Sequence, residues 1–164
     1  MKRTRIISWE DPAEGAQKAT LMSGLDYLQA MNDGTTSLPP LLFTLDFKAV
    51  SFESGQAIFS FEPQEFHYNP IGSVHGGVIS AILDSAMSCS LHATLEKGIA
   101  YTTLELKVNF LKVITIKTGK IQAIGKVIYA GKSTALVEAQ LIDANGTLYA
   151  HAVSTCMILR SKNI

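Results

Sequence analysis

The sequence has few charged residues and no long apolar run, and each shortage excludes a class of protein. Charged residues make up 17% of the chain, and fourteen acidic side chains balance fourteen basic ones. Without net charge there is no general attraction to nucleic acid. No stretch reaches the ~18 apolar residues that a membrane span needs. The basic start, residues 1–9, has no apolar segment behind it and is not a signal peptide.

Cysteine is also scarce, with Cys89 and Cys156 alone, and both lie in apolar segments. Buried thiols are typical of proteins from a reducing compartment, and we expect no disulfide between these two. We therefore expect a cytoplasmic protein that has neither a nucleic-acid nor a membrane partner. A chain of 164 residues is long enough for one domain with a proper core.

A mostly apolar stretch without proline follows a loop rich in proline and glycine and ends near Lys97–Gly98. Its length predicts a helix of about four to five turns. Apolar residues point in nearly every direction around it, which predicts a helix buried on all sides. Asp84 is the only acidic or basic residue between His75 and His92. A buried carboxylate is costly, so Asp84 needs hydrogen-bond partners or a chemical role.

The remaining segments predict a short helix and six strands. Residues 1–20 read as a polar, irregular arm, because Asp11–Pro12 and Gly15 argue against a long helix. Ser23 and Asp26 resemble a capping box for a short helix that ends near Gly34. Alternating apolar residues then predict two strands before the long helix and, after it, four strands in a meander, at 41–53, 56–61, 101–114, 119–130, 133–143 and 147–159.

The loop before the long helix carries a motif that resembles PaaI-type acyl-CoA thioesterases. The motif reads Asn-x-x-Gly-x-x-His-Gly-Gly and is formed by Asn69, Gly72 and residues 75–77. Asp84 follows nine residues after the histidine. The strand expected at 101–111 is similar to the next strand of that family.

This resemblance covers about residues 40–160 and implies a fold. The family has the hotdog fold, an α+β architecture in which a curled antiparallel sheet wraps around a long central helix. We accordingly expect an N-terminal arm and short helix at 1–39 and a hotdog thioesterase domain at 40–164. The family assembles as homodimers or homotetramers, with active sites at the dimer interface.

The same resemblance implies roles for individual residues. Asp84 would be the general base or the nucleophile. Thr103 on the following strand would assist, with Thr102 as the alternative. No metal and no cofactor is implied, since coenzyme A is part of the substrate. The groups that would bind and polarise the thioester carbonyl are Asn69, His75 and the backbone N–H of Gly76.

The chemistry of the residues indicates some of these roles without the family resemblance. The N–H groups of Gly76 and Gly77 at a helix start are free donors on the positive end of the helix dipole. The alternative is that Asp84 is a structural carboxylate and the two glycines only form a tight turn. Lys132, in a turn between strands, is our choice for contacting the phosphates of coenzyme A. We interpret the histidines outside the motif as packing or surface residues without metal-ligand spacing, at positions 67, 92 and 151.

The predicted function is hydrolysis of an acyl- or aryl-CoA thioester to the free acid and coenzyme A. Two alternatives remain. A hotdog hydratase or dehydratase uses a catalytic histidine in a different motif, which residues 67–70 resemble only superficially. A non-catalytic module that binds acyl-CoA, such as a repressor, needs a DNA-binding segment, and residues 1–40 show neither a helix-turn-helix nor a basic face.

Overall fold

The computed structural model describes residues 2–160 as an antiparallel sheet that curls around one long helix. The helices are α1 (Pro12–Leu21), α2 (Gly24–Asn32), α3 (Pro40–Leu45), the 3-10 turn η1 (Glu65–His67) and the central α4 (Gly76–His92). The strands are β1 (Phe47–Glu53), β2 (Gln56–Phe61), β3 (Ile99–Phe110), β4 (Ile121–Ala130), β5 (Thr134–Asp143) and β6 (Leu148–Arg160).

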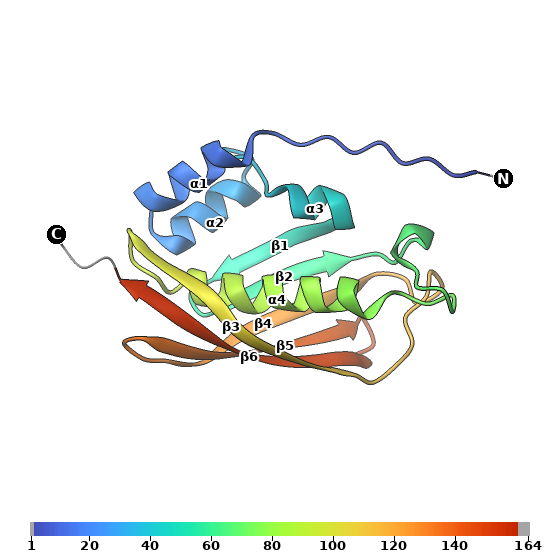
Figure 1. Ribbon diagram of the computed structural model, residues 1–164. Helices are drawn as coiled ribbons and strands as arrows, with labels where there is room; N and C mark the ends of the chain where they lie inside the picture. Colours follow the sequence, from blue (N-terminus) through green and yellow to red (C-terminus); the bar gives the residue numbers. More distant parts are fainter. Residues whose placement is uncertain (1, 161–164) are drawn as a thin grey trace.

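The six strands form one sheet in the order β1-β2-β4-β5-β6-β3, and all neighbouring pairs are antiparallel. Figure 1 shows α4 lying along the concave side of this sheet, with α1, α2 and α3 beyond β1. The expected α+β architecture, a curled antiparallel sheet around a long central helix, is confirmed. The meander holds only for β4, β5 and β6, because β3 pairs with β6 at the far edge. The long segment 111–120 carries the chain across to β4.

The core lies between α4 and the concave face of the sheet. Seven residues of α4 are buried there: Ile79, Ile82, Leu83, Ala86, Met87, Ser90 and Leu91. Helix and sheet touch through backbone at Gly125 of β4, where an added Cβ would lie 2.1 Å from the carbonyl oxygen of Ala86. The opposite face of α4 is only half-buried. Within a single chain the helix is therefore buried on one face, and not on all sides as we expected. Half-buried residues there include Ala81, Asp84, Ser85 and Ser88.

The N-terminal segment corrects one prediction, because residues 12–21 form a helix rather than an irregular arm. The Asp11 side chain accepts a hydrogen bond from the Ala13 N–H at 2.9 Å, and Pro12 occupies the first turn. Proline is favoured there, since its missing N–H is not needed. Gly15 permits close packing, because an added Cβ would lie 3.2 Å from the Ser37 hydroxyl.

Residues 40–45 correct a second prediction, because they form α3 instead of the start of a strand. The apolar alternation that suggested a strand belongs to a short helix begun by Pro40 and ended by Asp46, which has a left-handed φ of 52°. The strand begins only at Phe47. The short helix after Ser23 is confirmed as α2, with the Ser23 hydroxyl accepting from the Asp26 N–H.

The central helix ends at His92, several residues before Lys97–Gly98. Its last turn meets the start of α2, where the Gly24 N–H donates to the Leu95 carbonyl at 2.9 Å. A Cβ on Gly24 would lie only 1.7 Å from the His92 carbonyl oxygen. The two backbones are therefore in direct contact where α4 ends.

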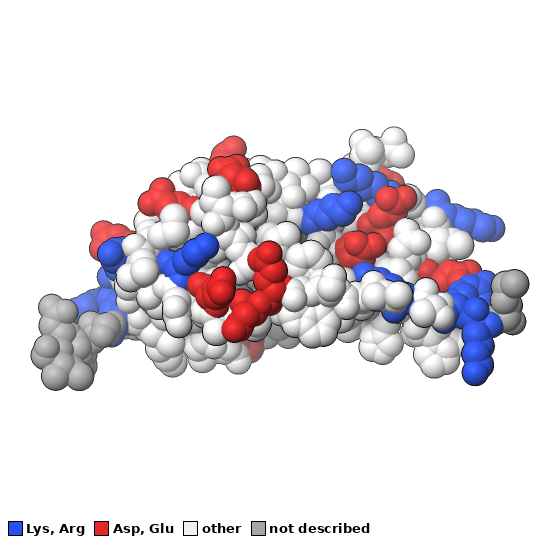
Figure 2. Space-filling view, turned by 90° about the horizontal axis from the view of Figure 1, so that it is seen from above, with Lys and Arg blue, Asp and Glu red and all other residues white. Residues whose placement is uncertain are grey.

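The surface agrees with the balanced composition. On the face shown in Figure 2, acidic and basic side chains both occur and are interspersed with uncharged surface. Both cysteines are free thiols, as expected. No helix in the described part of the chain is long and apolar enough to cross a membrane. The cytoplasmic location stays a prediction.

Candidate active site

The loop before α4 is shaped by Asn69. Its side-chain oxygen accepts hydrogen bonds from the N–H groups of Ile71 and Ser73, and its amide nitrogen donates to the Ser73 hydroxyl at 3.0 Å. Gly72 has a left-handed φ of 80°, which glycine adopts without steric cost. These bonds give Asn69 a structural task, and its second amide hydrogen stays available to a ligand.

His75 caps the helix that it precedes. Its Nδ1 accepts a hydrogen bond from the Gly77 N–H at 2.8 Å, so the neutral imidazole carries its hydrogen on Nε2. The Gly77 N–H is therefore occupied, unlike our expectation that both glycine N–H groups are free. The Gly76 N–H has no acceptor within residues 2–160. This turn thus offers two donors, the Gly76 N–H and the Nε2–H of the exposed His75 ring.

Asp84 lies on the half-buried face of α4 and is held by β3. The Thr103 hydroxyl donates to Asp84 Oδ1 at 3.1 Å, and the Ser88 hydroxyl lies 3.4 Å from the same threonine oxygen. The sheet register explains which threonine reaches the helix. The pairing of β3 with β6 is irregular between Thr103 and Glu105, which leaves Leu104 as the extra residue of a bulge.

Without this bulge, strict alternation from Glu105 would turn Thr103 outward and Thr102 toward the helix. With the bulge, Thr102 is exposed and Thr103 contacts the carboxylate. The bulge therefore decides which of the two adjacent threonine hydroxyls stands beside Asp84.

The surroundings of Asp84 are poorly solvated. Burial, with a contribution from the charge of Asp84, raises the pKa of the Cys89 thiol to about 12. Burial likewise raises the pKa of Tyr101 well above its ordinary range. Both groups stay protonated near neutral pH, so among these neighbours Asp84 is the side chain suited to accept a proton.

The two halves of the candidate site are apart within one chain. Asp84 is nine residues beyond His75, which at ~1.5 Å per residue separates them by ~13 Å along the helix. A cavity of about 310 Å³ opens beside Asn69 and Gly76, and within the described chain neither Asp84 nor Thr103 lines it. Each half holds part of what thioester hydrolysis needs.

Sequence reasoning missed two residues of this cavity, Phe110 and Lys112. The Phe110 ring lies against the helix start, since an added Cβ on Gly76 would be 3.1 Å from it. Both residues come from the end of β3 and the segment after it, more than thirty residues from the motif. No local pattern connects the two segments. Lys132, by contrast, is exposed in the turn between β4 and β5 and does not line this cavity.

Comparison with known proteins identifies the family to which the chain belongs. A family model described as the thioesterase superfamily matches residues 71–150, which include the helix start, Asp84 and Thr103. A candidate esterase of Saccharolobus solfataricus is 32% identical over 118 residues, covering 72% of this chain and 82% of that protein. The chain belongs to the thioesterase superfamily. The thioesterase is also 29% identical to 1,4-dihydroxy-2-naphthoyl-CoA hydrolase of Listeria monocytogenes, over 73% of its own length and 94% of that enzyme.

Solved structures give the same fold. A phenylacetic-acid-degradation-related protein of Ralstonia eutropha, described as a candidate thioesterase, superposes with a TM-score of 0.72 and 28% identity, covering 80% of the thioesterase and 98% of that chain. A thioesterase of Haemophilus influenzae superposes with the same TM-score at 18% identity, over 83% and 92% of the two chains, a likeness of fold. The expected hotdog fold and PaaI-type family are confirmed, and the enzyme is a thioester hydrolase.

Proposed function

We propose that this thioesterase hydrolyses acyl- or aryl-CoA to the free acid and coenzyme A, with Asp84 as the catalytic carboxylate. The observation that carries the proposal is the hydrogen bond from Thr103 to Asp84 on the half-buried face of α4. A structural carboxylate would have its hydrogen bonds within the core. Asp84 instead keeps one oxygen without a partner in the described chain, on the half-buried face of the helix.

In the proposed reaction the substrate carbonyl is bound by the turn at the helix start. The Gly76 N–H and the Nε2–H of His75 donate to the carbonyl oxygen, and they hold its negative charge as the carbon becomes tetrahedral. Asn69 contributes its free amide hydrogen. Asp84 removes a proton from water, which attacks the carbonyl carbon, or attacks it directly to form an anhydride that water then hydrolyses. The carbon–sulfur bond breaks, and the departing coenzyme A thiolate takes up a proton, from Asp84 in the first route and from solvent in the second.

Glycine at position 76 lets the substrate approach the backbone N–H, because it has no side chain of its own to cover that group. Gly77 supports the turn by donating to His75, which fixes the imidazole tautomer. Lys132 remains our proposed contact for the phosphates of coenzyme A. Arg160 donates to the Lys132 carbonyl, so a second cation lies beside it.

The distance within one chain leads us to propose that two copies share each site. At ~13 Å apart, Asp84 and His75 of one chain do not reach the same carbonyl. Two α4 helices packed antiparallel about a two-fold axis would bring Asp84 of one copy near His75 and Gly76 of the other. The half-buried face of α4 and the outer edge of β3, which within residues 2–160 pairs only with β6, would be covered by this partner in a dimer or tetramer.

Mixing two inactive variants tests both proposals. His75→Ala and Asp84→Ala are co-expressed, or dissociated and reassembled. With a shared site, a mixed dimer has one site with both wild-type residues and one with both lesions. Random pairing makes about half of the dimers mixed, so activity should recover to ~25% of wild type. Parents that form dimers but recover nothing on mixing would contradict the shared site.

The relatives support a coenzyme A thioester as substrate, since the name of one specifies a naphthoyl-CoA hydrolase. Release of free thiol from a panel of acyl- and aryl-CoA thioesters tests this. Catalysis gives many turnovers per site, whereas a module that only binds acyl-CoA gives none. Thioester cleavage also distinguishes a hydrolase from a hydratase, which would leave the thioester intact.

A further inference from the structure

His67 is a buried histidine outside the reacting groups described so far. Its side chain lies between two aromatic rings, with centroid distances of 4.7 Å to Phe61 and 4.1 Å to Phe66. The residue is only 2% exposed. The sequence suggested an ordinary packing histidine, and its burial agrees with that. The ring also makes hydrogen bonds that packing alone does not require.

Both ring nitrogens of His67 have backbone partners. The Gln64 N–H donates to Nδ1 at 2.9 Å, and Nε2 lies 2.8 Å from the Leu45 carbonyl oxygen. Because Nδ1 accepts, the hydrogen must be on Nε2, which donates to Leu45. Burial lowers the pKa of His67, and the charge of Arg5 lowers it further. The ring is therefore neutral near pH 7 and ties η1 to the end of α3, 22 residues away.

The backbone of His67 continues this connection to the helix start. Its carbonyl accepts a hydrogen bond from the His75 N–H at 2.8 Å. Next to this hydrogen bond, Tyr68 and Val74 form an isolated antiparallel β-bridge. The two ends of the motif loop are therefore held together. The position of His75, and with it the direction of the neighbouring Gly76 N–H, depends on where the His67 backbone is held.

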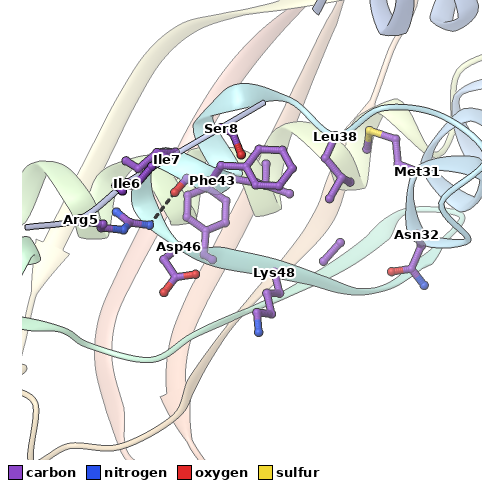
Figure 3. Close-up of a pocket in the computed structure, with 13 residues that line it drawn as sticks. Arg5, Ile6, Ile7, Ser8, Met31, Asn32, Leu38, Phe43, Asp46 and Lys48 are labelled. Carbon is purple, nitrogen blue, oxygen red and sulfur yellow. Dashed lines mark hydrogen bonds between the residues drawn. The ribbon is translucent and has the colours of Figure 1, made fainter. Parts of the chain in front are cut away.

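The outer side of this connection is covered by the N-terminal arm. Arg5 stacks on the Phe66 ring at 3.9 Å and donates to the carbonyls of Phe43 and Thr44 at the end of α3. Figure 3 shows the Arg5 side chain bonded to Phe43 at the edge of a cavity of about 540 Å³. Phe66 and the end of α3, the two features that flank His67, are therefore held from outside as well.

We propose that His67 is a positioning residue for the oxyanion-binding turn at His75 and Gly76. Its ring is fixed to Leu45 and its carbonyl is fixed to His75, so the turn keeps its place relative to the rest of the chain. This inference rests on the proposed function. His67 does not touch the substrate, and its effect is exerted through the His75 backbone.

Three variants test the proposal. His67→Phe keeps a ring between Phe61 and Phe66 but loses both hydrogen bonds. His67→Gln places an amide N–H near the position of Nε2 and keeps the bond to Leu45. Phe59→Leu is the matched control, because it removes a buried ring of β2 that contacts Phe47 and Phe52 instead of the loop.

We expect His67→Phe to lower kcat at least ~10-fold while KM stays within about threefold, because a misplaced oxyanion donor acts mainly on the transition state. His67→Gln should recover kcat to within about threefold of wild type. Phe59→Leu should unfold more easily but keep its kcat. Amide hydrogen exchange supplies a readout without turnover: the His75 N–H should exchange faster in His67→Phe, relative to amides of β5, and not in Phe59→Leu.

The outcomes separate the two proposals. A wild-type protein that cleaves none of the tested acyl-CoA thioesters would refute the proposed function. An active wild type with an unchanged kcat in His67→Phe would refute the role of His67 alone. The same holds if His67→Gln is as impaired as His67→Phe, since the bond to Leu45 would then not position the turn.

Discussion

Replacement of Asp84 by Asn separates a catalytic carboxylate from a structural one. The Asn side chain is nearly isosteric, and its oxygen can still accept the hydrogen bond that the Thr103 hydroxyl gives at 3.1 Å. The fold should therefore be kept, with a change of about 1 kcal/mol or less in unfolding free energy. The amide cannot act as a base or nucleophile, so kcat should fall at least ~10²-fold, or ~2.7 kcal/mol in activation free energy.

The two adjacent threonines supply a matched control for this prediction. Thr103→Val removes the hydroxyl that orients Asp84 and should lower kcat by about tenfold, because a hydrogen bond to a charged group contributes ~1.5–3 kcal/mol. Thr102→Val changes an exposed side chain one residue away and should leave kcat unaltered. Thiol release from an acyl-CoA measures all three variants. Asp84→Asn with near wild-type activity would show that the carboxylate is structural and refute the mechanism.

Three further expectations concern packing, reactivity and substrate. Gly125→Ala should lower the unfolding free energy by ~2 kcal/mol or more in urea, since the new Cβ would lie 2.1 Å from the Ala86 carbonyl oxygen; an unchanged midpoint would contradict this contact. Cys89, with its thiol pKa raised to about 12, should resist alkylation at pH 8 until the protein unfolds, and fast labelling of the native enzyme would disagree. Medium or long acyl-CoA, or aryl-CoA, should be cleaved with higher kcat/KM than acetyl-CoA, because each buried CH₂ adds up to ~0.8 kcal/mol; acetyl-CoA as the best substrate would be the opposite result.

The central features were predictable because their signals are local. The length of the apolar stretch predicted α4, and alternation predicted the strands on either side of the turns at Gly55 and Gly146, which have left-handed φ values of 81° and 78°. The motif at Asn69 and His75 lies within one loop and the helix that it starts. Periodicity and turn chemistry are properties of neighbouring residues, so one sequence is enough to recognise them.

The errors arose where distant residues decide the structure. The short α3 ends in carbonyls that Arg5 satisfies from about forty positions away, and nothing in residues 40–45 indicates this partner. α4 ends where its backbone meets Gly24, a residue far away in the sequence. Asp11 and Pro12 were interpreted as a break, although the same pair also starts helices, and only packing of Gly15 on Ser37 shows which applies.

For the same reason, the positions of the site residues could be predicted only in part from the sequence. The contact between Asp84 and Thr103 depends on a bulge whose extra residue has no distinctive type. Phe110 and Lys112 join the cavity at Gly76 through the path of the segment after β3. His67 gave no signal, because its partners at Leu45 and His75 are defined by tertiary structure.

The bulge in β3 also determines the effect of single-residue deletions on the register of the strand. Deleting Leu104 would leave Thr103 opposite Cys156 and Glu105 opposite Thr155, as they are now, so the strand would become regular with Thr103 still facing the helix. Deleting one residue on the C-terminal side, such as Val108, would instead shift every pair beyond it by one position. A single-codon loss at position 104 would therefore keep the register of β3 and leave Thr103 facing the helix.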